Sequence, residues 1–260
     1  METKLQRLKT PTAKPLIEIP KTVPTAGFIH NYFDGETFLE EYNERVKLDY
    51  KGNSVLKVIH YSDGVVKGSN PPSVILANKI LEQEGLRTVT HLDINEILRT
   101  KALSLIRTYE DIALIFKDEE KPNSYLAKKI AEQIKKREGK KIETPIIIPL
   151  NGLELKLDSN SPLGLTFIFT DKTKIIYAPI LSEENNKNGF SDKSENEFPI
   201  LNRERKKLLY TNNSGLSRFV MNYNGLESWN DLQISYGNGI IVVSSVKDTS
   251  TKNLEKSILR

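Results

Sequence analysis

The stretch that decides the fold is residues 214–245, SGLSRFVMNYNGLESWNDLQISYGNGIIVVSS. Asn, Tyr, Ser, Gly and Trp dominate its middle, and such a mixture is poor material for a hydrophobic core. Tyr and Trp provide large amphipathic area at low entropic cost, whereas Ser, Gly and Asn adapt their hydrogen bonds. Apolar anchors flank this middle: Leu216, Phe219, Leu226, Leu232 and residues 240–243. The pattern predicts a contact surface on a fixed frame, with an irregular loop between two strands as the alternative.

The first half of the chain predicts helices. Apolar residues four apart over 38–46 indicate one helix, and a second should begin at the N-cap Ser73 and stop at Gly85. A third is expected over 93–106. The clearest covers 123–137, because its apolar residues are four apart and its lysines lie elsewhere around the axis.

Strand patterns dominate the second half. Residues 144–157 and 163–181 are apolar runs broken by turn residues, and 240–243 follow a tight turn at 237–239. Earlier, residues 55–61 also predict a strand, followed by a loop over 62–72. Residues 112–116 predict a short buried strand or a helix end. Helices that precede strands, without alternating with them, indicate an α+β fold with helices mainly in the first half and strands in the second.

Composition limits the class of protein. The chain has 260 residues, with no Cys and a net charge of +4. The missing Cys excludes disulfides and thiolate chemistry. No apolar run is long enough for a membrane span, and the N-terminus lacks a signal-peptide core, so we expect a cytoplasmic or virion-associated protein. Four prolines predict an extended arm over residues 1–25, residues 182–198 predict an exposed polar loop, and the last residues predict a short helix.

Catalytic patterns are not apparent. His30, His60 and His91 form no metal-binding motif, and residues 63–69 lack the spacing of a phosphate-binding loop. The paired carboxylates, such as Glu40-Glu41, lie in polar stretches without the shielding that acid–base catalysis requires. Acidic residues show no calcium-ligand spacing. We therefore expect a protein that is not an enzyme and that uses no cofactor or metal.

A nucleic-acid-binding protein or metal-dependent nuclease of a virus or mobile element is the alternative. The lysines of residues 121–141 could contact a phosphate backbone, although a solvated helix face explains them as well. Glu154 and Lys156 alternate on a predicted strand and could join Asp111 or Asp158 in a magnesium-dependent nuclease site. Because only Tyr125 could stack on a base, we do not expect nucleic acid as the partner.

Residues 214–245 combine three features: the pattern SGLSR, the Asn- and Tyr-rich residues after it, and DLxxS with a glycine before four apolar residues and Ser. This combination resembles the C-termini of variable proteins. These are the targets of diversity-generating retroelements in archaea, their viruses and small-genome bacteria. Residues 61–90 and 121–134 are similar to the same proteins. The resemblance implies a single C-type-lectin-like domain over residues 26–260, with a variable region at about 215–243. It implies a non-enzymatic protein that binds an unknown protein or surface ligand.

In such proteins adenines of the variable region are replaced during reverse transcription, so residues compatible with AAY codons are candidates for variation. Met221, Glu227 and Gln233 do not fit an AAY origin. Trp229 does not fit one either, but we include it among the ligand-binding residues as an aromatic contact. The resemblance thus implies these ligand-binding residues: Val220, Asn222, Tyr223, Asn224, Ser228, Trp229, Asn230, Ile234, Tyr236 and Asn238.

Overall fold

A computed structural model of the chain describes residues 27–29, 34–91, 93, 107–140, 142–178, 181, 208–210, 214–222 and 225–245. Several sequence predictions lie outside these residues: the arm at 1–25, nearly all of the helix at 93–106, the loop at 182–198 and the final helix. The candidate site residues Tyr223 and Asn224 also lie outside them.

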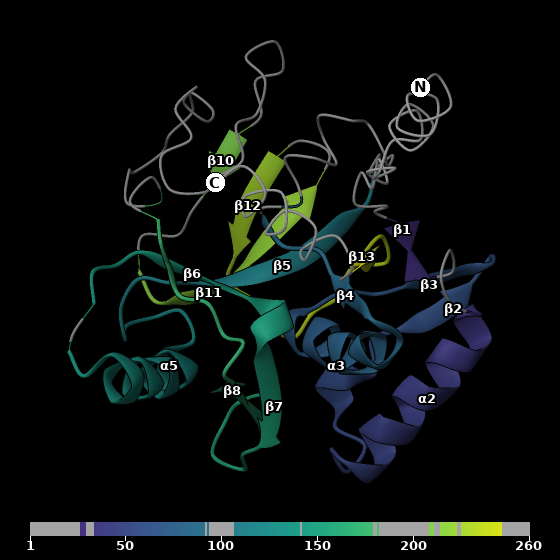
Figure 1. Cartoon of the computed structure of the whole chain (residues 1–260), viewed down its shortest axis with the longest axis horizontal. Helices are drawn as coiled ribbons and strands as arrows, with labels where there is room; N and C mark the ends of the chain where they lie inside the picture. Colours follow the sequence, from purple (N-terminus) through teal and green to yellow (C-terminus); the bar gives the residue numbers. More distant parts are fainter. Residues whose placement is uncertain are drawn as a thin grey trace, which may run out of the picture.

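A six-stranded sheet forms the centre of the structure (Figure 1), in the order β10-β12-β11-β5-β6-β9. All neighbouring strands in it are antiparallel except β10 and β12, which are parallel. The strands are β5 (Tyr109–Phe116), β6 (Ile146–Pro149), β9 (Ile176–Tyr177), β10 (Leu208–Tyr210), β11 (Leu216–Asn222) and β12 (Gly225–Trp229).

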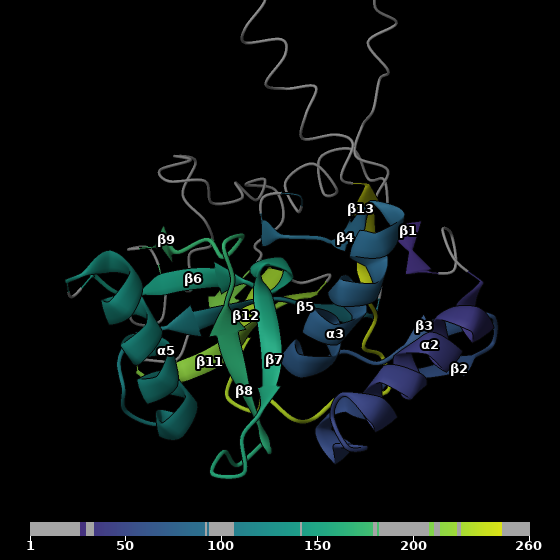
Figure 2. The same ribbon diagram turned by 60° about the horizontal axis from the view of Figure 1, so that its bottom comes forward.

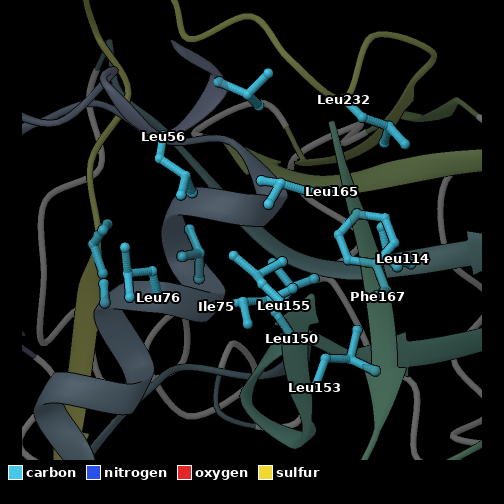
Figure 3. Packing of buried hydrophobic residues seen from close by; sticks show 14 of the residues in the cluster. Leu56, Ile75, Leu76, Leu114, Leu150, Leu153, Leu155, Leu165, Phe167 and Leu232 are labelled. Atoms are coloured by element: carbon cyan, nitrogen blue, oxygen red, sulfur yellow. The ribbon is translucent and has the colours of Figure 1, made fainter. Parts of the chain in front are cut away.

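One face of this sheet carries most of the core. Three helices and a hairpin pack there (Figure 2), and their leucines, isoleucines and Phe167 meet Leu114 of β5 (Figure 3). The packed elements are α2 (Gly35–Leu48), α3 (Pro71–Leu81), α5 (Ser124–Glu138), β7 (Leu153–Leu157) and β8 (Leu165–Phe169). A smaller apolar cluster, which includes Ile115, Ile147 and Phe219, lies on the opposite face, as strand alternation requires.

Smaller elements complete the frame. A three-stranded sheet has the order β1-β13-β4, and β2 pairs with β3 in a separate hairpin. Their bounds are β1 (Gly27–Phe28), β2 (His60–Ser62), β3 (Val65–Lys67), β4 (Leu86–Thr88) and β13 (Val242–Ser245). The residues described also include the 3₁₀ turns η2 (Ser54–Leu56), η3 (Glu82–Glu84) and η4 (Leu150–Gly152). Among the residues described, no helix has the length and apolar character needed to cross a membrane.

The helix predictions are confirmed for α2 and α5, but the start of α3 was placed wrongly. Its N-cap is Asn70, not Ser73. The Asn70 side chain accepts a hydrogen bond from the Ser73 amide at 2.8 Å, and the Ser73 hydroxyl accepts one from the Asn70 amide at 3.0 Å. Pro71 and Pro72 occupy the first helical turn, where their missing N–H groups cost nothing.

The prediction of a strand over residues 55–61 is wrong. Its first residues belong to the turn η2, and the strand β2 does not begin until His60. The predicted loop at 62–72 contains β3 and the start of α3. Residues 112–116 do form a strand, as the C-terminal part of β5. The α+β class is confirmed, although helices and strands are interspersed along the chain, because β1 to β5 also lie in its first half.

A buried carboxyl group joins the central sheet to the three-stranded sheet. Glu110 of β5 has no exposed surface, and its Oε1 accepts a hydrogen bond from the Val242 amide at 2.8 Å. Burial raises the pKa of Glu110 well above its usual range; the Val242 amide opposes this shift, and the carboxylates of Asp111 and Asp93 add to it. Its Oε2 has no hydrogen-bond partner in the part of the chain that is described. Burial at this junction therefore favours the neutral, protonated form of Glu110.

The raised pKa of Glu110 predicts a pH dependence of stability. As pH rises above about 4.5, the ordinary value for glutamate, the unfolded chain ionises first, so the wild type loses stability until the folded pKa is passed. Glu110→Gln retains the acceptor for Val242 and cannot ionise. We expect urea unfolding between pH 5 and 8 to show a smaller loss of stability in Glu110→Gln. Parallel pH profiles would contradict a raised pKa of Glu110.

Candidate functional site

Four side chains from three strands lie on one face of the central sheet because of a β-bulge. Arg218 of β11 pairs with Leu114 of β5, and the second residue beyond it, Val220, pairs with Asp111. Ile112 is left without a partner at this register shift, which turns Asp111 to the face of Leu114 and Arg218. Without the bulge, alternation would place Asp111 on the opposite face. Tyr109 of β5 and Trp229 of β12 share this face with them.

Arg218 and Asp111 form a buried ion pair. The Arg218 Nε lies 3.0 Å from the Asp111 Oδ1, and their side chains are 1% and 0% exposed. The other carboxylate oxygen accepts a hydrogen bond from the Ser69 hydroxyl at 2.7 Å. Burial raises the pKa of Asp111, while the guanidinium of Arg218 and the hydroxyl of Ser69 lower it. Because arginine stays protonated in proteins, charge balance requires the ionised carboxylate.

The guanidinium of Arg218 also holds the loop of residues 230–239, which we call the display loop. Its Nη1 donates hydrogen bonds to the carbonyl oxygen of Ile234 at 2.6 Å and to that of Asp231 at 3.3 Å. The guanidinium carbon lies 4.8 Å from the Trp229 ring centre and 5.3 Å from that of Tyr109. One buried cation therefore connects the carboxylate beneath it, two aromatic rings and the backbone of the loop.

Other framework residues hold the rest of the display-loop backbone. The side-chain amide of Asn70, at the start of α3, donates to the Gln233 carbonyl at 2.7 Å. The Tyr109 hydroxyl accepts a hydrogen bond from the Tyr236 amide at 2.8 Å. At the start of the loop, the side-chain amide of Asn123 donates to the Asn230 carbonyl at 2.7 Å.

Two residues of the display loop fix it from within. Leu232 points into the core (Figure 3) and is 1% exposed. The Asp231 carboxylate accepts hydrogen bonds from the amides of Gln233 at 2.7 Å and Ile234 at 3.0 Å. An aspartate that accepts hydrogen bonds from the amides two and three residues later stabilises a tight turn.

Most of the remaining side chains of the display loop face solvent, whereas Ser235 is partly buried. Ile234 is 45% exposed and Tyr236 is 52% exposed, and Asn230, Gln233 and Asn238 are exposed polar residues. Tyr236 contacts the partly buried Trp229 edge to face, with ring centres 5.5 Å apart. The exposed groups are apolar, aromatic and amide side chains. Two side chains of the loop add to its attachment: Asn238 donates a hydrogen bond to the Arg107 carbonyl at 3.0 Å, and the Ser235 hydroxyl accepts one from the Ser69 amide at 2.8 Å.

The structure brings together five of the ten sequence-derived site residues at the display loop: Trp229, Asn230, Ile234, Tyr236 and Asn238. Asn222 lies on the same sheet face, where the Glu227 carboxylate accepts hydrogen bonds from its amide and from the Trp229 indole, each at 2.8 Å.

Two further candidates do not lie at this surface. Val220 is fully buried, so its side chain offers no area to a ligand. Ser228 pairs with Phe219 and thus points to the opposite face of the sheet, where its hydroxyl donates to that of Ser217 at 2.8 Å.

The residues that hold the loop were not recognised from sequence. Arg218 stood out within SGLSR, but nothing nearby indicated that its partner is Asp111, which is 107 positions earlier in the chain. The sequence indicates Asp111 only as an acidic residue of the alternative nuclease site. Asn70 could have been found, because an asparagine before two prolines is a good helix cap.

The nuclease residues do not converge. Glu154 and Lys156 are exposed on β7, whereas Asp111 is buried against Arg218. Asp158 accepts a hydrogen bond from the Tyr125 hydroxyl at 2.8 Å. Within the described ranges, no three His, Asp or Glu side chains are grouped so that they could hold a metal ion.

A surface hollow of about 580 Å³ adjoins the display loop. Pro122, Tyr125, Pro162 and Leu163 line it, and Asn230 of the loop contributes to the same wall. The loop and the hollow therefore form one continuous surface.

Comparisons of this chain with protein-family models, with curated proteins and with solved structures find no match. Function is therefore inferred from the residues and from the geometry of the loop.

Removal of one partner of the buried ion pair should strongly destabilise the protein. We expect Arg218→Met and Asp111→Asn each to cost about 3–5 kcal/mol, because each leaves a buried group without its counter-charge. The double variant should lose less than the sum of the two, by roughly 1 kcal/mol or more. Urea unfolding followed by circular dichroism and by the fluorescence of Trp229, the single tryptophan, measures both quantities. Additive losses would contradict a coupled pair.

The display-loop backbone should depend on Tyr109 more than on its own exposed side chains. Tyr109→Phe removes the acceptor of the Tyr236 amide, and we expect a loss of about 1–3 kcal/mol. Hydrogen exchange at the Tyr236 amide should also become faster. Ile234→Ser is the control, with an expected change within about 0.5 kcal/mol because the side chain is exposed. If Ile234→Ser accelerates this exchange as much as Tyr109→Phe does, the loop is not held by its frame.

Proposed function

We propose that this chain is a ligand-binding protein whose contact surface is Trp229 together with the display loop. One observation carries the proposal: Arg218, Tyr109 and Asn70, all outside the loop, hold its main chain through hydrogen bonds. Its exposed side chains are therefore free to contact a ligand. A backbone ordered in advance lowers the entropy that binding would otherwise cost.

The chemistry of the exposed groups supports the same conclusion. Four large hydrophobic side chains are exposed among the described residues, Leu48, Tyr177, Ile234 and Tyr236, and two of them lie in this one loop. Their neighbours are amides, which donate and accept hydrogen bonds. Such a surface suits a protein or other macromolecular surface, where aromatic and apolar anchors provide most of the affinity.

The more specific form of the proposal is a variable protein of a diversity-generating retroelement with a C-type-lectin-like fold. It rests on the resemblance of residues 214–245 to such proteins. Diversification requires that side chains change without loss of the fold. A loop held by residues outside it meets this requirement, because Asn230, Ile234 and Tyr236 take part in the hydrogen bonds to the frame through their backbone groups.

Sequencing of the 3′ end of the gene in a natural population tests the proposal. We expect a reverse-transcriptase gene nearby and a non-coding near-copy of codons 215–243 that differs at adenines. Variation should fall at the codons of Asn230, Ile234 and Tyr236. The codons of Arg218 and Asp231 should be constant, because their side chains hold the loop.

Val220 provides a further contrast, because valine is compatible with an AAY origin but this side chain is fully buried. We expect that codon to be constant as well. An invariant region without a near-copy would refute diversification by a retroelement. Variation concentrated at Arg218, Asp231 or Val220 would refute display by this loop.

A further inference from the structure

The positive charge of the chain is concentrated on α5 and its flanks. Residues 121–140 contain seven Lys and Arg and two Glu, a net charge of +5, whereas the whole chain carries +4. The other 240 residues together are therefore almost neutral. Basic charge gathered on one element is the electrostatic footprint of a polyanion-binding surface.

The structure leaves most of these cations in solvent without a counter-charge. Lys121, Lys128, Lys135, Lys136 and Lys140 are exposed. No ion pair joins any of the five to another residue in the described ranges, whereas Lys129 pairs with Glu132 at 3.0 Å. Leu126, Ile130 and Ile134 face the core, so α5 keeps its cations on the outer side of the molecule (Figure 1).

We propose that the outer face of α5 binds the phosphate backbone of double-stranded nucleic acid. A 15-residue helix is about 22 Å long, and Lys128 and Lys135 lie about 10 Å apart along it. A duplex presents one phosphate charge for about each 1.7 Å of its axis, so several lysines reach phosphates at once. The binding site is separate from the display loop and does not rest on the function proposed for that loop.

The side chains of α5 favour nucleic acid over an anionic membrane. Peripheral membrane helices insert an apolar face into the lipid, and the large apolar side chains of α5 are already buried in the core. Binding to nucleic acid through lysines alone needs no such face.

The same surface contacts phosphates without reading bases. Gln133 is the amide side chain within α5, and it is engaged inside the molecule. Its nitrogen donates to the Phe167 carbonyl at 2.8 Å, and its oxygen accepts from the Phe169 amide at 2.8 Å. Arg137 donates to the Thr173 carbonyl at 2.7 Å. Affinity should therefore be independent of sequence and strongly dependent on salt.

Fluorescence anisotropy with a labelled 20-base-pair duplex tests this proposal on the full chain. The variant is Lys128→Gln/Lys135→Gln/Lys136→Gln. Its matched control is Lys47→Gln/Lys51→Gln/Lys57→Gln, which removes the same charge from exposed lysines elsewhere. We expect wild type to bind, with the slope of log K against log salt reduced by about 1 for each α5 lysine removed. The α5 variant should bind at least roughly ten-fold more weakly at low salt, and the control should bind like wild type.

Each other outcome overturns the proposal. No binding by wild type at low salt excludes the surface. Equal losses in the two triple variants show a general charge effect. Binding to phosphatidylserine vesicles but not to the duplex assigns the surface to membranes. Circular dichroism verifies that both variants fold, and Tyr236→Ala, which alters the display loop alone, should leave duplex binding unchanged.

Discussion

The display loop lies where it does because a guanidinium group without access to solvent holds its carbonyl groups. The buried guanidinium of Arg218 needs acceptors, which these carbonyls supply, while Asp111 balances its charge. Apolar contacts alone would allow several loop positions of similar energy. Hydrogen bonds from a fixed planar group allow far fewer, since each lost bond leaves a buried polar atom without a partner. Leu232 adds apolar burial to this directional constraint.

The β-bulge at Ile112 is what makes the ion pair possible. It adds one residue to β5 and so sends Asp111 to one face of the sheet while its neighbour Glu110 goes to the other. The two acidic side chains then have different roles. Asp111 meets a permanent cation, whereas Glu110 meets a backbone amide and apolar residues. One local irregularity thereby joins the central sheet to the display loop on one side and to the three-stranded sheet on the other.

The two proposed surfaces differ in chemistry, and Asn123 connects the elements that carry them. The display loop offers aromatic and amide groups, whereas α5 offers lysines. Asn123, at the start of α5 in a left-handed conformation, donates hydrogen bonds to the carbonyls of Leu216 and Asn230, each at 2.7 Å. The position of the helix is therefore tied to β11 and to the display loop, so the two surfaces have a fixed relative orientation.

The sequence by itself determined the α+β class, the helices α2 and α5, most strands after residue 144, and the exposure of Ile234 and Tyr236. These follow from local periodicity and turn residues, which act between neighbours in the chain. The sequence wrongly predicted a strand over residues 55–61, whose first residues fold as a turn, and it placed the cap of α3 at the wrong residue. Only the tertiary structure decided that Val220 is buried, that Ser228 faces away, and that Asp111 and Asn70 hold the loop. The physical reason is that strand register and pairing between distant residues decide which face a side chain occupies, and one bulge reverses that face without a local signal.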